Sequence, residues 1–331
     1  MEQIVIEKSN RKTMNASLSI IIVNYRTPDL IIQCVESIKK HLHNIEKEII
    51  IVDNNSCDDS KNLITNEYSD VIWIQNLKNE GFGRANNKGI SYAKHDLILL
   101  LNSDTIIIDN SIHELVIRYI SEPKSIKIAS CQLINQDYIL QKSVFFKNSA
   151  FSEILLNNLL FDYFFGKYFK SRKAAEIKAL HGACLIFDRK RMNDIGYFDE
   201  DFFLYAEEFE LCHRVRKRGG KLKHYSDLKI IHLEGESSIS SEWNINQRMI
   251  STALLYRKNR GFFGYLLFLF LCIGNIIINS IFLWKMNSNY RKDFLCYIKR
   301  FFSYLPIYFN LITLNFEPPL RICDKNKNCF S

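Results

Sequence analysis

Hydrophobic residues gather in four short runs in the first third of the chain, and each run has asparagine or aspartate at or next to its last position. The runs occupy residues 18–25, 47–55, 70–76 and 95–104. Within them the apolar positions are mostly consecutive rather than alternating, which is typical of strands covered by helices on both faces. We therefore predict four parallel strands at these positions.

Between the runs, apolar residues recur at the spacing of helices. The helical stretches start at Asp29, Asp58 and Arg84, and the two aspartates are expected to cap their helices. This alternation predicts an open α/β sheet, mostly parallel, with right-handed crossovers and flanking helices. In such a sheet ligands bind at the carboxyl ends of the strands, where Asp53 and Asp104 are expected.

The pattern changes after about residue 125. Residues 126–134 and 138–146 alternate in polarity, as strands of a mixed sheet do. Two further strands are predicted within residues 179–188 and 228–238, on either side of a helix at 207–219.

The C-terminal region is strongly apolar. Residues 261–284 carry no charge and are long enough to cross a bilayer at about 1.5 Å per residue, and a second apolar run at 301–316 contains Pro306. Basic residues flank the first run on both sides, so its ends do not favour opposite membrane faces. We expect a hairpin, or helices lying in the cytoplasmic interface, with a helical pair packed on the preceding domain as the alternative.

The chain is thus predicted to have three parts: a flexible polar tail at 1–16, an α/β domain at 17–260, and a membrane-associating region at 261–331. The net charge of +8 suits a membrane surface or an anionic substrate and does not indicate nucleic acid. The tail lacks the apolar core of a signal peptide, which favours a cytoplasmic location at the inner face of the cell membrane.

One segment raises the question of chemistry. The residues "LILLLNSDTIIID", 97–109, deliver Asn102, Ser103 and Asp104 to the end of a predicted strand. A carboxylate there can ligate Mn²⁺ or Mg²⁺, because hard cations prefer oxygen ligands. A turn or a helix cap is the simpler alternative.

Five blocks in fixed order favour the chemical interpretation. They are "IVDNNSCDDS", "NEGFGRANNKGI", "LLLNSDT", "GYFDEDFFLYAEEFELCHRVRKRGG" and "IIHLEGESS". Over residues 17–260 the chain resembles the family 2 glycosyltransferases of the GT-A fold, with the closest likeness to the bacterial branch that includes rhamnosyltransferases. The resemblance implies a nucleoside-diphosphate sugar donor, such as dTDP-rhamnose or a UDP-hexose, and a lipid-linked glycan acceptor. It also implies a role in bacterial surface polysaccharide synthesis, of O-antigen or capsule.

The resemblance assigns roles to individual residues. Glu208 matches the family's base and Glu207 its paired acid, while Asp104 and His232 match positions at the divalent cation. The residues implied to contact the nucleotide sugar are Asn24, Tyr25, Asp53, Asn79, Gly81, Asn86 and Asn102. Glu208 departs from the family, which prefers aspartate there, and Asn102 stands where the first acid of the metal motif often lies.

The mechanism implied is an inverting single displacement without a covalent enzyme intermediate. Two rival classes are a non-catalytic sugar-nucleotide-binding or scaffold protein of the same fold, and a nicotinamide oxidoreductase. The absence of a glycine-rich fingerprint after the first strand counts against the oxidoreductase.

Several charged residues also have a structural interpretation. Glu210 and Arg214 are spaced for a helix-surface ion pair. The two aspartates of "FDEDFF", at 199 and 201, either border the acceptor or cap the following helix. Arg257 and Lys258 are expected to be solvated or to face a membrane.

Overall fold

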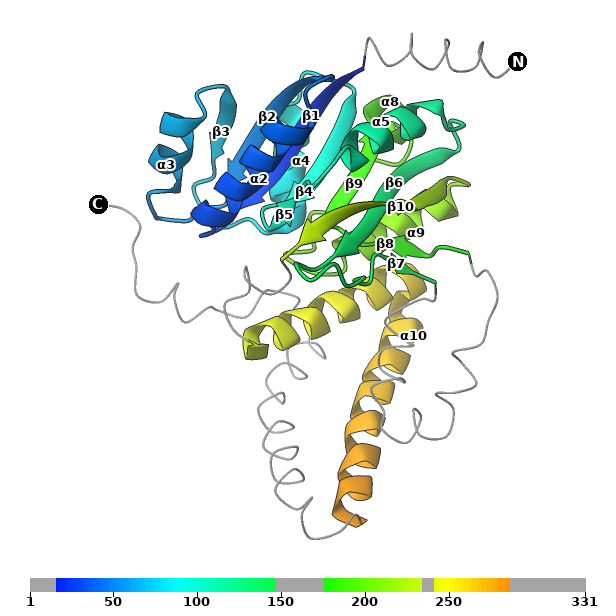
Figure 1. Ribbon diagram of the computed structural model, residues 1–331. Helices are drawn as coiled ribbons and strands as arrows, with labels where there is room; N and C mark the ends of the chain where they lie inside the picture. Colours follow the sequence, from blue (N-terminus) through cyan, green and yellow to red (C-terminus); the bar gives the residue numbers. More distant parts are fainter. Residues whose placement is uncertain (1–15, 147–175, 234–240, 286–331) are drawn as a thin grey trace.

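The computed structural model describes residues 16–146, 176–233 and 241–285 (Figure 1). Its first half confirms the four predicted strands, which are β1 (Ser17–Asn24), β2 (Glu46–Asp53), β3 (Val71–Gln75) and β4 (Leu97–Asn102). These pair in parallel in the order β3-β2-β1-β4. The connecting helices are α2 (Pro28–His41), α3 (Ser60–Glu67) and α4 (Phe82–Tyr92).

The helix starts differ from the sequence prediction. Helix α2 has Thr27 at its N-cap position, without a capping side-chain hydrogen bond, and Pro28 in its first turn, because the fixed φ of proline suits that position. The N-cap of α3 is Asp59, whereas the preceding Asp58 accepts a hydrogen bond from the Ser60 amide at 3.0 Å. Helix α4 begins two residues before Arg84, at Phe82.

The second half of the chain extends the same sheet. Strand β9 (Cys184–Asp188) lies antiparallel between β4 and β6 (Ile126–Ile134). Next come β10 (Lys221–His232), parallel to β6, and the short β5 (Thr105–Ile106), antiparallel to the end of β10. The complete order is β3-β2-β1-β4-β9-β6-β10-β5, so the α/β, mostly parallel sheet is confirmed.

Two of the later predictions were only partly right. Residues 138–146 form only the two-residue strand β7 (Val144–Phe145), which pairs with β8 (Ala179–Leu180). The segment 179–188 is divided into β8 and β9 by a turn around Gly182. The predicted helix is present as α9 (Glu207–Lys217).

Each face of the sheet carries its own hydrophobic core. One core joins Ile20 and Ile22 to α2, α3 and α5 (Ser111–Ser121), whereas the other joins Ile21 to α4 and α9. Successive residues of β1 thus enter opposite cores, because side chains alternate across a strand. This explains why residues 20–23 of the strand are apolar without alternation.

A long helix, α10 (Ser241–Lys285), follows the sheet and bends at Gly261, whose φ is 69°. Its first part lies across the end of the sheet domain, and its second part runs away from the domain (Figure 1). The bend falls at the predicted boundary between residues 260 and 261. In the part of the chain that is described, no helix has both the length and the apolar character needed to cross a membrane. The polar tail and the apolar run at 301–316 lie outside the described residues.

Candidate active site

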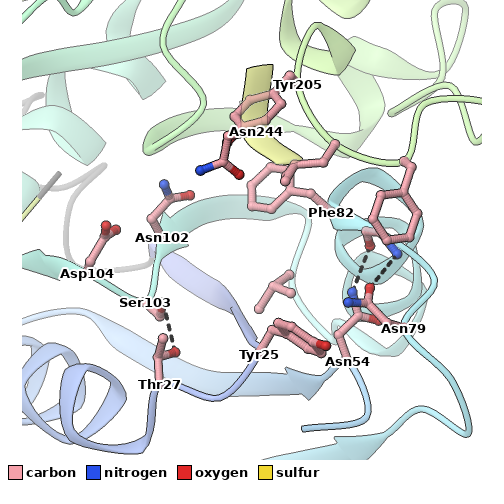
Figure 2. A pocket seen from close by; sticks show the side chains of 14 residues that line it. Tyr25, Thr27, Asn54, Asn79, Phe82, Asn102, Ser103, Asp104, Tyr205 and Asn244 are labelled. Carbon is pink, nitrogen blue, oxygen red and sulfur yellow. Dashed lines mark hydrogen bonds between the residues drawn. The ribbon is translucent and has the colours of Figure 1, made fainter. Parts of the chain in front are cut away.

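A cavity of about 210 Å³ lies at the carboxyl ends of β1, β2 and β4, and we call it the strand-end cavity (Figure 2). The register of the sheet forms it, since Val23 is paired with Asn102 across β1 and β4. Its described lining residues are Val23, Tyr25, Thr27, Asn54, Asn79, Gly81, Phe82, Asn102, Ser103, Asp104, Phe203, Leu204, Tyr205 and Asn244.

Asp53 lies beside this cavity rather than in its wall. Its carboxylate is buried and accepts four hydrogen bonds, from Asn24 Nδ2 at 2.7 Å, Gln75 Nε2 at 2.6 Å, and the Ser56 amide and hydroxyl at 2.9 and 2.5 Å. Asn24 and Asp53 therefore fix the loops after β1 and β2. Asp53 also lines a shallow cavity of about 260 Å³ with Trp73 and Gln75 on the outer side of β2. Its predicted contact with the nucleotide stays a prediction.

The loop before α4 forms one side of the strand-end cavity. The Gly81 amide donates to Asn79 Oδ1, and the Gly81 carbonyl accepts from Asn54 Nδ2, each at 3.0 Å (Figure 2). Gly81 has a φ of 88°, and a Cβ there would lie 2.2 Å from the carbonyl oxygen of Phe203. Only glycine allows this approach.

Two further asparagines differ in their placement. Asn86 is buried and donates to the Phe82 carbonyl at 3.0 Å, so it supports the helix and does not line the cavity. Asn54 does line the cavity, although the sequence analysis passed over it. Its position immediately after Asp53 was the available signal.

Asp104 and His232 meet at the inner end of the strand-end cavity. Both are buried, and Asp104 Oδ1 lies 3.4 Å from His232 Nε2. The antiparallel pairing of β5 with β10 places Thr105 opposite His232, and the Leu233 amide donates to the Asp104 carbonyl at 2.9 Å. The structure thus brings together the two predicted cation ligands.

The side chains at this point suit a cation shared with a substrate. Asn102 Oδ1 is buried and has no hydrogen-bond partner among the described residues. That oxygen, the Asp104 carboxylate and the His232 imidazole are donor types that Mn²⁺ and Mg²⁺ accept. No group of three or more His, Cys, Asp or Glu side chains in the described residues could hold a metal by itself. A cation here would therefore need oxygen ligands from a bound phosphate or from water.

A second cavity of about 390 Å³ adjoins the first, and we call it the helix-α9 cavity. The two cavities share the lining residues Phe82, Asn102, Leu204 and Tyr205. Glu207, Glu208 and His232 are in the wall of the helix-α9 cavity. Asp104 lines the strand-end cavity and His232 lines the helix-α9 cavity. Because these two side chains are in contact, they mark the place where the cavities meet.

The paired acids differ in environment. Glu207 and Glu210 share the buried side of α9, whereas Glu208 is half-buried and lines the cavity. Burial, and then the charge of Glu208, raise the pKa of Glu207 well above its usual value. Glu207 Oε2 has no hydrogen-bond partner in the described structure. Of the two, Glu208 is the less buried one in the cavity wall, whereas burial disfavours the charged form of Glu207.

The turn that starts α9 has an unusual backbone. Tyr205 and Ala206 have φ values of 67° and 69°, a conformation that costs about 1–2 kcal/mol for each non-glycine residue. Helix α10 braces this turn, because the Leu204 carbonyl accepts from Ser251 Oγ at 2.7 Å and from Gln247 Nε2 at 3.3 Å.

The contribution of α10 was missed by the sequence analysis. Asn244 enters the strand-end cavity from above, opposite Tyr25 and Thr27 (Figure 2). Arg248 and Thr252 line the helix-α9 cavity. The available signal was a stripe of polar residues three or four apart, at 244, 247, 248, 251 and 252, in a largely apolar helix.

Three predictions about charged side chains need correction. Glu210 and Arg214 do form an ion pair, at 2.7 Å, but it is largely buried, and Arg214 also donates to the Ile195 carbonyl at 2.6 Å. Lys258 is not a simple solvated charge, because its ammonium group forms ion pairs with Asp199 at 2.5 Å and Asp201 at 2.6 Å. These aspartates tie the loop before α9 to α10 and do not cap a helix.

His181 is a further site residue that the sequence analysis did not select. Its ring packs edge-on against His232 with centroids 5.4 Å apart. Burial lowers the pKa of His181 to about 4, and the charges of His232, Arg248 and Lys142 act in the same direction. His181 is therefore neutral at physiological pH.

The chain matches the sequence profile described as Glycosyl transferase family 2 over residues 19–195, more than half of its length. The chain belongs to this family and is a glycosyltransferase. It is 26% identical to the low-salt glycan biosynthesis hexosyltransferase Agl10 of Haloferax volcanii, over 82% of this chain and 87% of the relative. It is also 25% identical to the poly-beta-1,6-N-acetyl-D-glucosamine synthase of Staphylococcus aureus, over 57% of this chain but only 45% of that protein.

Solved structures support the fold. A mannosyltransferase of Pyrobaculum calidifontis, in complex with GDP-Man and Mn²⁺, superposes with a TM-score of 0.55 at 11% identity, covering 95% of this chain and 91% of that one. Residues 1–349 of S. aureus TarS give a TM-score of 0.50 at 15% identity, with 91% and 88% covered. The GT-A fold is thus confirmed. The predicted rhamnosyltransferase branch is not confirmed, because none of these relatives is named as a rhamnosyltransferase.

Proposed function

We propose that this glycosyltransferase moves a sugar from a nucleoside diphosphate to a hydroxyl of a glycan acceptor, with inversion at the transferred carbon. The observation that carries the proposal is the junction of the two cavities. One cavity ends at Asp104, the other contains Glu208, and the Asp104–His232 contact lies between them. A donor in the strand-end cavity and an acceptor in the helix-α9 cavity would meet there.

Each side chain has a separate task in this scheme. Glu208 takes the proton of the acceptor hydroxyl as that hydroxyl attacks the sugar. Tyr25, Asn54, Asn79 and Asn102 orient the nucleotide sugar, and Asn24 and Asp53 hold the loops that carry these groups. A divalent cation, Mn²⁺ or Mg²⁺, held by Asp104 and His232, would supply charge stabilisation for the departing diphosphate.

Relatives named for glycan biosynthesis and for synthesis of a polysaccharide support a role in building a glycan. We propose that the product is a surface polysaccharide and that the acceptor is lipid-linked. The donor in this proposal is a UDP-hexose or dTDP-rhamnose. The test is a donor panel of UDP-, GDP- and dTDP-sugars, in which released nucleoside diphosphate is measured with and without Mn²⁺. Release that depends on the sugar nucleotide and is lost in Glu208→Gln is the expected result. Failure of every donor to bind would contradict the proposal.

We also place the enzyme at the inner face of the cell membrane. After the bend at Gly261, α10 exposes Phe263 by 84% and Phe270 by 72%, and Arg257 and Arg260 lie just before the bend. Apolar side chains next to basic ones suit a helix lying on an anionic membrane surface.

Flotation with vesicles tests this placement. The full-length protein should float with vesicles that contain phosphatidylglycerol, and Phe263→Ser with Phe270→Ser should reduce the bound fraction. Exposed Leu77, which lies on the sheet domain, provides the control Leu77→Ser. Equal recovery of the protein with and without vesicles would refute the placement.

A further inference from the structure

The helix-α9 cavity contains cationic side chains that the proposed transfer does not use. Arg248 enters from α10, and Lys142 enters from the segment before β7. Neither residue is in the wall of the strand-end cavity, where the donor is placed. The cavity therefore offers positive charge on the acceptor side.

The position of Arg248 is defined by its contact with Tyr205. Its guanidinium carbon lies 4.5 Å from the centroid of the Tyr205 ring, and the Arg248 side chain is exposed. No carboxylate lies within ion-pair distance of Arg248 among the described residues. An aromatic ring holds an arginine in place by a cation–π contact while leaving its N–H donors free to bind an anion.

Lys142 also contacts an aromatic ring in the cavity wall. Its Nζ lies 4.5 Å from the centroid of the Phe145 ring, and Phe145 is also part of the cavity wall. Arg248 lies on α10 and Lys142 before β7, and both line this cavity. Two cations on different elements thus face one space.

The remaining walls define what kind of anion fits. Leu133, Phe145, Phe209 and Leu255 make part of the cavity apolar, and Glu208 is its half-buried carboxylate. A free anion in such a space would gain from the cations and nothing from the apolar walls. A phosphate ester with a carbon-rich substituent would gain from both.

We propose that Arg248 and Lys142 form an anion subsite, so that the acceptor carries a phosphate group close to the hydroxyl that Glu208 activates. This inference rests on the proposed function, which assigns the helix-α9 cavity to the acceptor. The acceptor class is thus a phosphorylated glycan, either linked to a lipid or soluble. The donor diphosphate is the competing ligand, and it would bind in the strand-end cavity.

Calorimetric titration of the full-length protein with phenyl phosphate tests the subsite. Phenyl phosphate should bind, and Arg248→Met and Lys142→Met should each weaken binding about tenfold, because each removes a charge-assisted hydrogen bond. Lys217→Met is the matched control, since Lys217 is exposed on α9 away from both cavities and should leave binding unchanged.

A second set of titrations uses UDP or GDP with Mn²⁺. Saturating nucleotide should not displace phenyl phosphate, and both variants should bind nucleotide as the wild type does. Displacement by nucleotide, equal binding in the variants, or no binding at all would overturn the subsite. Loss of nucleotide binding by the wild type would instead contradict the proposed function. Tighter binding of dodecyl phosphate than of glucose 1-phosphate would assign the phosphate to a lipid carrier, and the reverse to a soluble acceptor.

Discussion

Asp104 and His232 lie far apart in the sequence, yet their side chains are 3.4 Å apart and buried at the boundary of two cavities. The pairing of β5 with β10 produces this contact, because it sets His232 opposite the residue that follows Asp104. The two-residue strand β5 thus holds Asp104 against His232, at the point where donor and acceptor would meet.

Removing the Asp104 carboxylate tests the cation. We expect Asp104→Ala to lower nucleoside-diphosphate release by about a hundredfold or more, because a bound cation stabilises the transition state by several kcal/mol. Excess chelator should lower release by the wild type to the same extent, and added Mn²⁺ should restore the release. Asp109→Ala is the control, since Asp109 lies outside both cavities. Full activity in chelator would contradict a role for the cation.

The base assignment predicts a change in turnover and not in donor binding. Glu208→Gln should lose at least about a hundredfold in kcat, because an amide cannot take the acceptor proton. Glu208→Asp should keep part of the activity on a shorter arm. Steady-state kinetics with a donor titration measure both quantities, and Glu67→Gln, an exposed change on α3, is the control. A fully active Glu208→Gln enzyme would require another base.

Glu207 should affect the pH dependence of stability. Burial raises its pKa in the folded state, so the native protein keeps a proton that the unfolded chain loses above a pH of about 4.3. The stability that this group contributes is therefore lost as pH rises from that value through the folded pKa. Glu207→Gln should gain free energy of unfolding relative to wild type as pH rises, measured by urea denaturation at several pH values. If the difference in free energy of unfolding between Glu207→Gln and wild type does not change with pH, Glu207 is ionised in the folded protein.

Ser251 should act on catalysis through the turn that it braces. Ser251→Ala removes the 2.7 Å hydrogen bond to the Leu204 carbonyl, and we expect a loss of about 1 kcal/mol in stability. Because Leu204 leads into Glu207 and Glu208, kcat should also fall while the donor KM stays constant. Ser251→Thr keeps the hydroxyl and should restore kcat. Ser121→Ala removes a comparable serine-to-carbonyl bond on α5 and should leave kcat unchanged.

Alanine substitutions at Gly81 and Gly219 separate two costs to stability. One is the collision of a new Cβ with a neighbouring atom, and the other is the strain of a positive φ. Both have positive φ, but a Cβ at Gly81 would collide with the Phe203 carbonyl, whereas a Cβ at Gly219 would meet no atom within 4 Å. Gly219→Ala should cost about 1–2 kcal/mol, and Gly81→Ala about 3 kcal/mol or more. Thermal denaturation measures both, and equal losses would exclude a tight contact between the α4 loop and the turn before α9.

The sequence predicted the parallel half of the sheet well, because buried parallel strands contain runs of consecutive apolar residues. It predicted the later strands less well. Residues 138–146 alternate as a strand does, yet only Val144 and Phe145 form a strand, and Leu140 makes a single isolated bridge to Ile134. Local pattern cannot reveal whether a partner strand exists.

Sequence motifs could point to some of the candidate residues. Asp104 and Glu208 lie within recognisable blocks, and the structure places them in the walls of the two cavities. Arg248 and Ser251 belong to no such block, and their role depends on α10 crossing the end of the sheet domain, which is a matter of tertiary packing. Likewise, Lys258 became a partner of Asp199 only through that packing.

Helix α10 contributes both to the wall of the helix-α9 cavity and to the exposed apolar surface, although it lies outside the segment that matches the family. The family match ends at residue 195, but the cavity walls continue to Leu255, and the same helix then bends at Gly261 into its exposed apolar part. An exchange of the chain after residue 240 between two members of the family would therefore transplant part of the helix-α9 cavity wall and the exposed apolar surface together. Under the proposed function, the choice of acceptor and the membrane placement of the enzyme would be inherited as one unit.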